Sequence, residues 1–146
     1  MIRIIQCYFE LSEGIECSGI SNKPILLYFT GHGSIKSRQF ESEVISDNEI
    51  QKILIQKFII VNLYVDDVGT AHIQHQIYNE QTNDTIKRIG KINKYYQKEL
   101  FDEDIQPAFY IIDANGNQLD KSFYFDDSIE SFKSFLEYGL EKYYEQ

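Results

Sequence analysis

The chain has 146 residues, of which 14 are lysine or arginine and 23 are aspartate or glutamate, so its formal charge is −9. A chain of this size buries about two-thirds of its unfolded surface, and 42% hydrophobic residues supply a core, which predicts one folded domain over residues 1–146. The excess of carboxylates argues against a nucleic-acid partner, because a phosphate backbone attracts clustered lysine and arginine.

No apolar run in the sequence reaches the ~20 residues that a membrane-spanning helix needs, so we expect no membrane insertion by this chain. Its first 14 residues lack the long apolar stretch and the small-residue cleavage site of a signal peptide. We therefore expect a cytoplasmic protein, or a mature or excised domain whose leader is absent. Two cysteines, Cys7 and Cys17, are too few for a disulfide scaffold; they are either unpaired or form a regulatory disulfide in an oxidising compartment.

The first half of the chain alternates helical and strand patterns. Residues 9–21 suit a short, imperfect helix, and the continuous apolar run 25–29 is typical of a strand buried on both faces. Residues 35–45 contain no glycine or proline and favour a helix. Ser46 and Glu49 have the spacing of a capping box, which predicts a second helix that leads into a buried strand over 58–65.

The second half begins with a polar, weakly patterned segment over 66–84, which we interpret as an insertion or loop. A helix is expected over 85–100 and a strand over 107–113. A strong turn signal at Asn115 and Gly116 then predicts a hairpin with a returning strand over 121–125. The last helix carries a continuous apolar stripe, made of Ile129, Phe132, Phe135, Leu136 and Leu140. Strands that alternate with helices and close in a hairpin predict an α/β sandwich with a mixed central sheet.

Three motifs carry a resemblance to a known family. They are KPILLYFTGHGSIKSRQFE at 23–41, LYVDD at 63–67 and QPAFYIIDANGN at 106–117, and an aromatic final helix follows them. The chain resembles the thioredoxin-like domain at the C-terminal end of DsbD-type thiol:disulfide interchange proteins. The resemblance implies a thioredoxin-like fold, a mixed sheet flanked by helices, with an insertion before the helix that precedes the cis-proline strand.

In such domains two thiols at a strand-to-helix turn exchange electrons with a partner disulfide. The corresponding positions here are Ser34 and Ser37. Two hydroxyls cannot form a disulfide, so the resemblance implies a domain that is redox-inactive as written. The serines are either an engineered replacement, which the survival of Cys7 and Cys17 favours, or a natural loss. Tyr28 favours natural loss, because it stands where the family usually has an aspartate that assists proton transfer.

The resemblance also implies a substrate groove. Gln106 and Pro107 match the family's cis-proline pair, although Pro107 could simply begin a strand. His32, Gly33, Ile35 and Lys36 surround the serines in sequence. The expected partner is a protein or peptide, in the family a redox partner protein, and no cofactor or metal is implied. The location is periplasmic if the chain is a domain of a larger or leader-bearing protein.

Two other chemistries were weighed. Ser34, His32 and a carboxylate such as Glu41 could suggest a hydrolase, but no nucleophile-elbow motif is present, and a helix N-cap explains Ser34 better. His72 and His75, three residues apart, lack the further ligands of a zinc site. Two functions therefore compete: an interchange domain whose reactive pair is replaced, and a non-catalytic thioredoxin-fold module that binds peptides.

Overall fold

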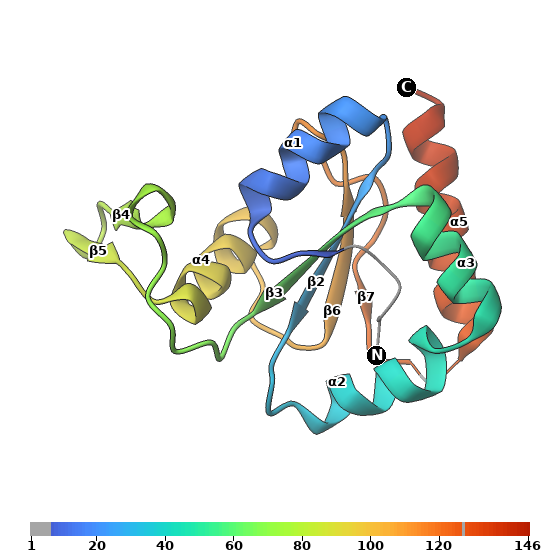
Figure 1. Ribbon diagram of the computed structural model, residues 1–146, viewed down its shortest axis with the longest axis horizontal. Coiled ribbons are helices and arrows are strands. Elements are labelled where there is room, and N and C mark those ends of the chain that lie inside the picture. Colours follow the sequence, from blue (N-terminus) through green and yellow to red (C-terminus); the bar gives the residue numbers. More distant parts are fainter. Residues whose placement is uncertain (1–6, 127) are drawn as a thin grey trace.

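The computed structural model describes residues 7–126 and 128–146, and its centre is a five-stranded mixed sheet in the order β1-β3-β2-β6-β7 (Figure 1). Strands β1, β3 and β2 are parallel to one another, and β6 and β7 continue the sheet antiparallel. This confirms the predicted α/β class with a mixed sheet. The strands are β1 Cys7–Tyr8, β2 Ile25–Thr30, β3 Ile59–Tyr64, β6 Ala108–Ile112 and β7 Phe123–Tyr124.

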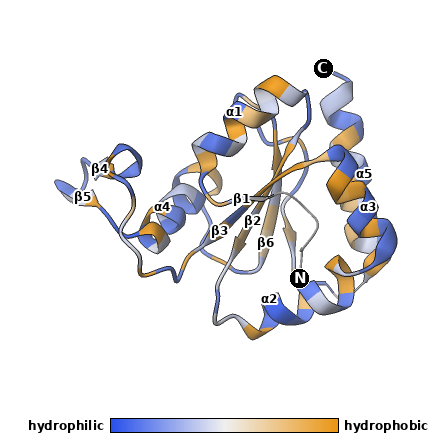
Figure 2. Ribbon diagram, viewed as in Figure 1, coloured by the Kyte–Doolittle hydropathy of each residue, from blue (hydrophilic) through white to orange (hydrophobic). Residues whose placement is uncertain are grey.

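Helices cover both faces of the sheet, which explains why its central strands are apolar at nearly every position (Figure 2). Helices α1 (Leu11–Ser21) and α4 (Ile89–Phe101) pack on one face, against side chains such as Leu27 and Val61. Helices α2 (Ile35–Phe40), α3 (Asn48–Lys57) and α5 (Ile129–Tyr144) cover the other face. Among the described residues, no helix combines the length and apolarity that a membrane span requires.

Two details of the helical half differ from the prediction. The helix expected over 35–45 is α-helical only to Phe40 and continues as a π-helical turn over Glu41–Ile45. The predicted capping box at Ser46 is wrong, because the Asp47 carboxylate accepts the hydrogen bonds of the first turn of α3 while the Ser46 hydroxyl donates to the Ser42 carbonyl. Aspartate is an equally good cap, and it stands one residue nearer the helix.

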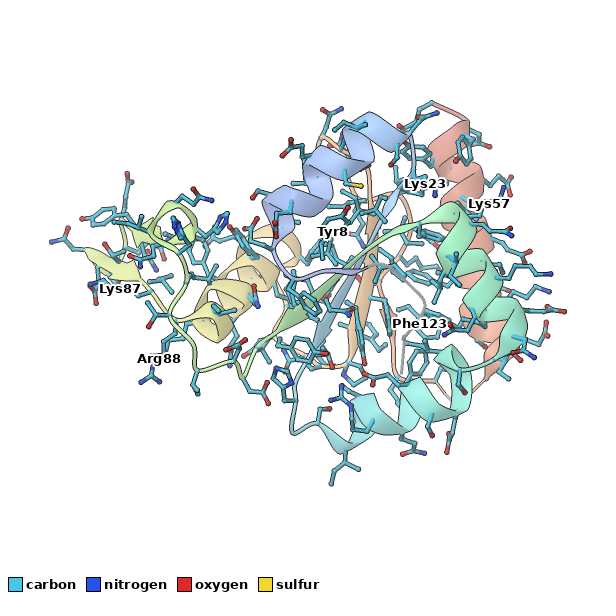
Figure 3. All side chains as sticks on the ribbon, viewed as in Figure 1. Tyr8, Lys23, Lys57, Lys87, Arg88 and Phe123 are labelled. Atoms are coloured by element: carbon cyan, nitrogen blue, oxygen red, sulfur yellow. The ribbon has the colours of Figure 1, made fainter. Side chains whose placement is uncertain are left out.

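The segment over 66–84 contains more structure than the sequence suggested. It forms a short 3-10 turn, Ile73–His75, and a separate two-stranded hairpin of β4 (Ile77–Asn79) and β5 (Asp84–Ile86). The predicted helix start at residue 85 is therefore wrong, because Ile86 pairs with Ile77 across the hairpin and α4 begins only at Ile89. The hairpin projects beyond α4, and Lys87 and Arg88 at its base point away from the sheet (Figures 1 and 3).

Candidate functional site

The segments that carry the predicted site meet at one edge of the sheet. Parallel β2 and β3 both end there, since Thr30 pairs with Tyr64, and antiparallel β6 begins there, since Ala108 pairs with Phe29. The loop that follows β2 leads to Ser34, the loop that follows β3 carries Asp66, and Pro107 immediately precedes β6. The topology thus gathers motifs that are far apart in the sequence.

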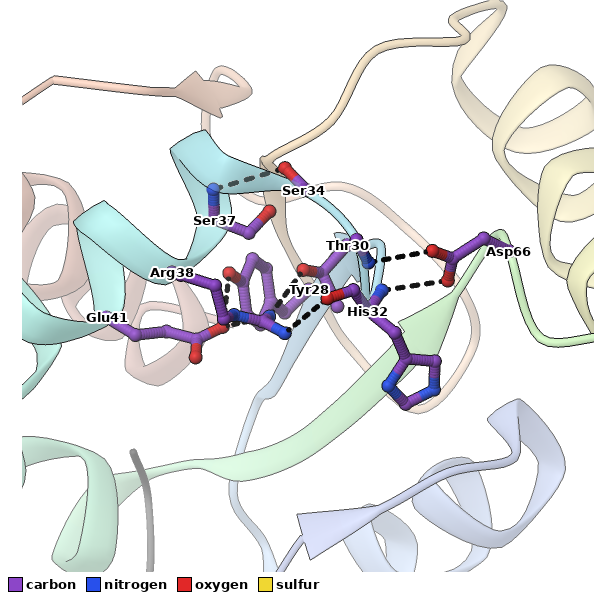
Figure 4. Close-up of polar contacts among 9 residues, drawn as sticks. Tyr28, Thr30, His32, Ser34, Ser37, Arg38, Glu41 and Asp66 are labelled. Atoms are coloured by element: carbon purple, nitrogen blue, oxygen red, sulfur yellow. Dashed lines mark hydrogen bonds and ion pairs between the residues drawn. The ribbon is translucent and has the colours of Figure 1, made fainter.

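Ser34 and Ser37 occupy the first turn of α2 (Figure 4). Ser34 is the N-cap, and its hydroxyl accepts a hydrogen bond from the Ser37 backbone N–H at 3.1 Å. The predicted capping role of Ser34 is confirmed. Ser37 is fully buried, and among the described residues its Oγ makes no hydrogen bond of good geometry, although its interaction with the Tyr28 hydroxyl lowers the pKa of that phenol. An unpaired buried hydroxyl costs about 1–3 kcal/mol, so this slot suits a less polar atom than oxygen.

Tyr28 lies beneath α2 and belongs to a polar network. Its ring stacks on Phe109 at 4.3 Å, and its hydroxyl donates to the Glu41 carboxylate at 2.9 Å. Arg38 donates to the same carboxylate at 2.6 Å and also to Thr30. Burial, and secondarily the nearby Glu41 charge, raises the pKa of Tyr28 well above its ordinary value. The phenol therefore stays protonated and supplies no general base near neutral pH.

Asp66 fixes the turn between β2 and α2. Its carboxylate accepts hydrogen bonds from the backbone N–H groups of His32 at 2.8 Å and Gly33 at 3.0 Å. Burial alone would raise the pKa of Asp66, but these N–H groups outweigh it and hold the pKa below its ordinary value. The His32 ring stacks on Tyr64 at 3.7 Å. The turn that presents Ser34 is therefore attached to β3 by both its backbone and a side chain.

The loop that leads into β6 forms the opposite wall. The peptide bond between Gln106 and Pro107 is cis. The Gln106 side chain donates to Gln97 of α4 at 3.0 Å, and Gln97 in turn donates to the Ile105 carbonyl at 2.9 Å. Gln97 is fully buried, whereas Gln106 is half-buried and Ile105 is exposed, so these bonds lie at the margin of the core.

Exposed apolar side chains stand on all three segments. Ile35 is 82% exposed, Val68 is 79% exposed and Ile105 is 45% exposed. Lys36 is exposed beside Ile35. Each of the three segments that meet at this edge therefore presents one apolar side chain to solvent.

Sequence reasoning missed Asp66, Arg38 and Gln97 as members of this site. The acidic pair at 66–67 belongs to the LYVDD motif, and an acid directly after a buried strand indicates a side chain at the edge of the sheet where the site lies. Gln97 had a weaker signal: Asn93 and Gln97 are uncharged amides one turn apart on a helix that is otherwise rich in lysine, and both are buried.

The hydrolase alternative finds no support in the geometry. The Ser34 hydroxyl accepts from Ser37, the His32 ring stacks on Tyr64, and the Glu41 carboxylate is bound by Tyr28 and Arg38. Each member of the supposed triad therefore has another partner, and no described bond joins any two of them.

The two loop histidines also have ordinary partners. His72 accepts the Gln74 backbone N–H as cap of the 3-10 turn, and His75 lies 3.4 Å from the Glu10 carboxylate. Within residues 7–126 and 128–146 no three metal-binding side chains converge. Cys17 has a free thiol that accepts a hydrogen bond from Tyr8, while the side chain of Cys7 lies outside the described part.

One surface depression lies elsewhere. It measures about 1320 Å³ and is bounded by residues 118–123 and by α5, with Phe135 and Tyr138 among its lining residues. None of the residues that line it belongs to the Ser34 and Pro107 edge.

Comparison with known proteins supports the architecture. A family model described as "Thioredoxin-like domain" matches residues 12–139. The structure of a DsbH oxidoreductase aligns with a TM-score of 0.67 at 19% identity, covering 94% of this chain and 85% of that one. A thioredoxin from Thermus thermophilus aligns with a TM-score of 0.64 at 12% identity, covering 92% and 86%.

The reduced C-terminal domain of DsbD from Neisseria meningitidis aligns with a TM-score of 0.56 at 11% identity, covering 87% of this chain and 91% of that one. At these identities the structural matches show the fold alone. A comparison with curated protein sequences finds no significant match. The predicted thioredoxin-like fold is confirmed.

Proposed function

We propose that this chain, which belongs to the thioredoxin-like domain family, is a thiol:disulfide interchange domain that is redox-inactive as written because Ser34 and Ser37 stand where reactive thiols would be. The proposal depends most on Ser37, which is buried one helical turn after the cap and whose hydroxyl makes no hydrogen bond of good geometry with the residues that the structure describes. A thiol is a weaker hydrogen-bonding group than a hydroxyl and is among the groups most often buried, so it fits this slot with less cost.

The chemistry that the parent scaffold would perform needs no cofactor. A thiolate at position 34, favoured by the helix N-terminus, would attack a partner disulfide, forming a mixed disulfide and releasing one partner thiolate. The thiol at position 37 would lose its proton and attack the sulfur at position 34, which releases the second partner thiolate and closes the internal disulfide. Two electrons pass to the partner in this cycle, and the domain is oxidised. In the DsbD-type proteins that the chain resembles, a membrane partner reduces the domain again, and on that resemblance the proposed location is periplasmic if the chain is a domain of a larger or leader-bearing protein and cytoplasmic otherwise.

The double substitution Ser34→Cys, Ser37→Cys tests this proposal. In insulin reduction driven by dithiothreitol, we expect the double variant to accelerate precipitation of the insulin B chain while the unaltered chain does not. Ser128 and Ser131 supply a matched control, since Ser128 caps α5 and its hydroxyl accepts from the Ser131 N–H at 3.2 Å. A folded double variant at 34 and 37 that is no faster than Ser128→Cys, Ser131→Cys would refute the proposal.

A second candidate is a non-catalytic binding module. It is favoured by Tyr28, a neutral phenol that stands where the family usually has a proton-transfer aspartate. The Tyr28 hydroxyl donates to the Glu41 carboxylate, which Arg38 also binds. The exposed Ile35 and the Pro107 loop would then serve peptide recognition alone. In this reading the unaltered chain binds an extended peptide, and binding falls on Ile35→Glu but not on Ile20→Glu, an equally exposed isoleucine on α1. Cysteine codons at 34 and 37 in the natural gene would identify the serines as introduced, whereas serine codons would favour this module.

A further inference from the structure

The loop before β6 depends on a single buried side chain of α4. Gln97 is fully buried, and its amide makes three hydrogen bonds. Its Nε2 donates to the Ile105 carbonyl and to the Tyr110 hydroxyl, both at 2.9 Å, and its Oε1 accepts from the Gln106 side chain at 3.0 Å. Two of these partners are the residues directly before Pro107.

The same amide connects this loop to the sheet. The Tyr110 hydroxyl donates to Glu103 at 2.7 Å, and the Tyr124 hydroxyl donates to the other oxygen of that carboxylate. The Tyr110 ring also stacks on Phe101 at 3.7 Å. Glu103, near the start of the loop, is thus bound to β6 and β7, and Gln97 links the residues beside Pro107 to β6 through Tyr110.

An amide is the chemical group that this position requires. Only a side chain with both a two-proton donor and an acceptor can serve a carbonyl, a hydroxyl and a second amide at once. A carboxylate at position 97 could only accept, and it would lie near Glu103. An aliphatic side chain of the same length would leave the Ile105 carbonyl without this donor. Gln106 and Tyr110 would each lose one hydrogen bond and keep another, to Asp104 and to Glu103.

We propose that Gln97 is a positioning residue for partner binding. Its hydrogen bonds hold Ile105 and Gln106, and with them Pro107, in the position in which an extended partner chain would pair with the loop. This inference rests on the proposed function, since it concerns the same groove. Through Gln97, α4 contributes to partner binding, although it lies far from Ser34 in sequence and its outer face is charged and solvated. Gln97 touches no reacting atom.

The test uses Gln97→Met in the Ser34→Cys, Ser37→Cys background, with insulin as the probe. The matched control is Gln51→Met on α3, because Gln51 also donates to a backbone carbonyl, that of Ile45, at 2.7 Å, on the far side of the sheet from α4. We expect the KM for insulin to rise by about five- to tenfold in Gln97→Met, with kcat within about twofold, because the thiol pair is untouched. An unchanged KM, or an equal rise in Gln51→Met, would overturn the inference.

Amide hydrogen exchange of the chain as written separates this result from a failure of the proposed function. We expect faster exchange at residues 103–106 in Gln97→Met and unaltered exchange there in Gln51→Met. If the double cysteine background proves inactive, the proposed function fails, and exchange alone decides for Gln97. Exchange that is unchanged by Gln97→Met would then overturn the positioning role as well.

Discussion

Ser34 and Ser37 are three residues apart on one short helix, yet their hydroxyls should have opposite effects on stability. The Ser37 hydroxyl is buried without a well-formed hydrogen bond to any described residue, and an unsatisfied buried hydroxyl costs about 1–3 kcal/mol. Alanine is also a better helix former than serine, by up to about 0.5 kcal/mol. Removal of one oxygen leaves a small void that offsets part of this gain. We therefore expect Ser37→Ala to raise the free energy of unfolding by about 1–2 kcal/mol.

Ser34→Ala provides the internal comparison. Its hydroxyl caps α2 through the Ser37 N–H, and loss of such a cap destabilises a protein by about 0.5–2 kcal/mol. Urea unfolding with an unchanged m-value measures both differences directly. In a chain of about 150 residues each kcal/mol corresponds to roughly 2–4 °C in Tm.

The result for Ser37→Ala decides whether the site reasoning holds. Stabilisation by Ser37→Ala together with destabilisation by Ser34→Ala would support a slot shaped for a less polar atom. Destabilisation by Ser37→Ala of more than about 0.5 kcal/mol would mean that the hydroxyl is satisfied in solution, and the interpretation of position 37 as a thiol position would lose its physical basis.

Two further predictions concern the frame that holds the site. Asp66 has a depressed pKa, so its contribution to stability is present above the ordinary carboxyl pKa of 3.8 and is lost as the pH falls through the folded value. In urea titrations, the stability difference between the unaltered chain and Asp66→Asn should therefore shrink below about pH 4. A stability difference that is constant from pH 7 to pH 2 would contradict this. Gly90→Ala should destabilise the protein by about 1–3 kcal/mol in thermal unfolding, because the new Cβ would lie 2.5 Å from the Val65 carbonyl oxygen. Gly19→Ala on α1, whose new Cβ would have nothing within 4 Å, should stabilise the protein by about 0.5–1 kcal/mol. Equal effects at the two glycines would refute the close packing of α4 on the end of β3.

The sequence predicted the parts of the fold that depend on burial. The apolar runs 25–29 and 58–65 correspond to β2 and β3, which are covered on both faces. The hairpin over 77–86 escaped prediction because each of its strands has only three residues and none of them is buried. Strand β1 was missed for a related reason: it has only two residues, and its partner β3 lies about fifty residues away.

The candidate site could be located from sequence but not assembled. Ser34, Ser37 and Pro107 were placed by the resemblance, and the capping role of Ser34 follows from its residue type and position. The role of Asp66 depends on the register that sets Thr30 beside Tyr64, and no local pattern encodes that register. Gln97 appears polar and solvated in a helical pattern, and it is buried only because the loop before β6 folds over it.

The central claim is that a dithiol scaffold underlies the two serines of α2. Insulin turnover by the Ser34→Cys, Ser37→Cys variant, compared with the equally spaced pair at 128 and 131, tests it most directly. The account predicts turnover for the pair on α2 and none beyond background for the pair on α5. Equal rates from the two variants, both folded, would contradict it.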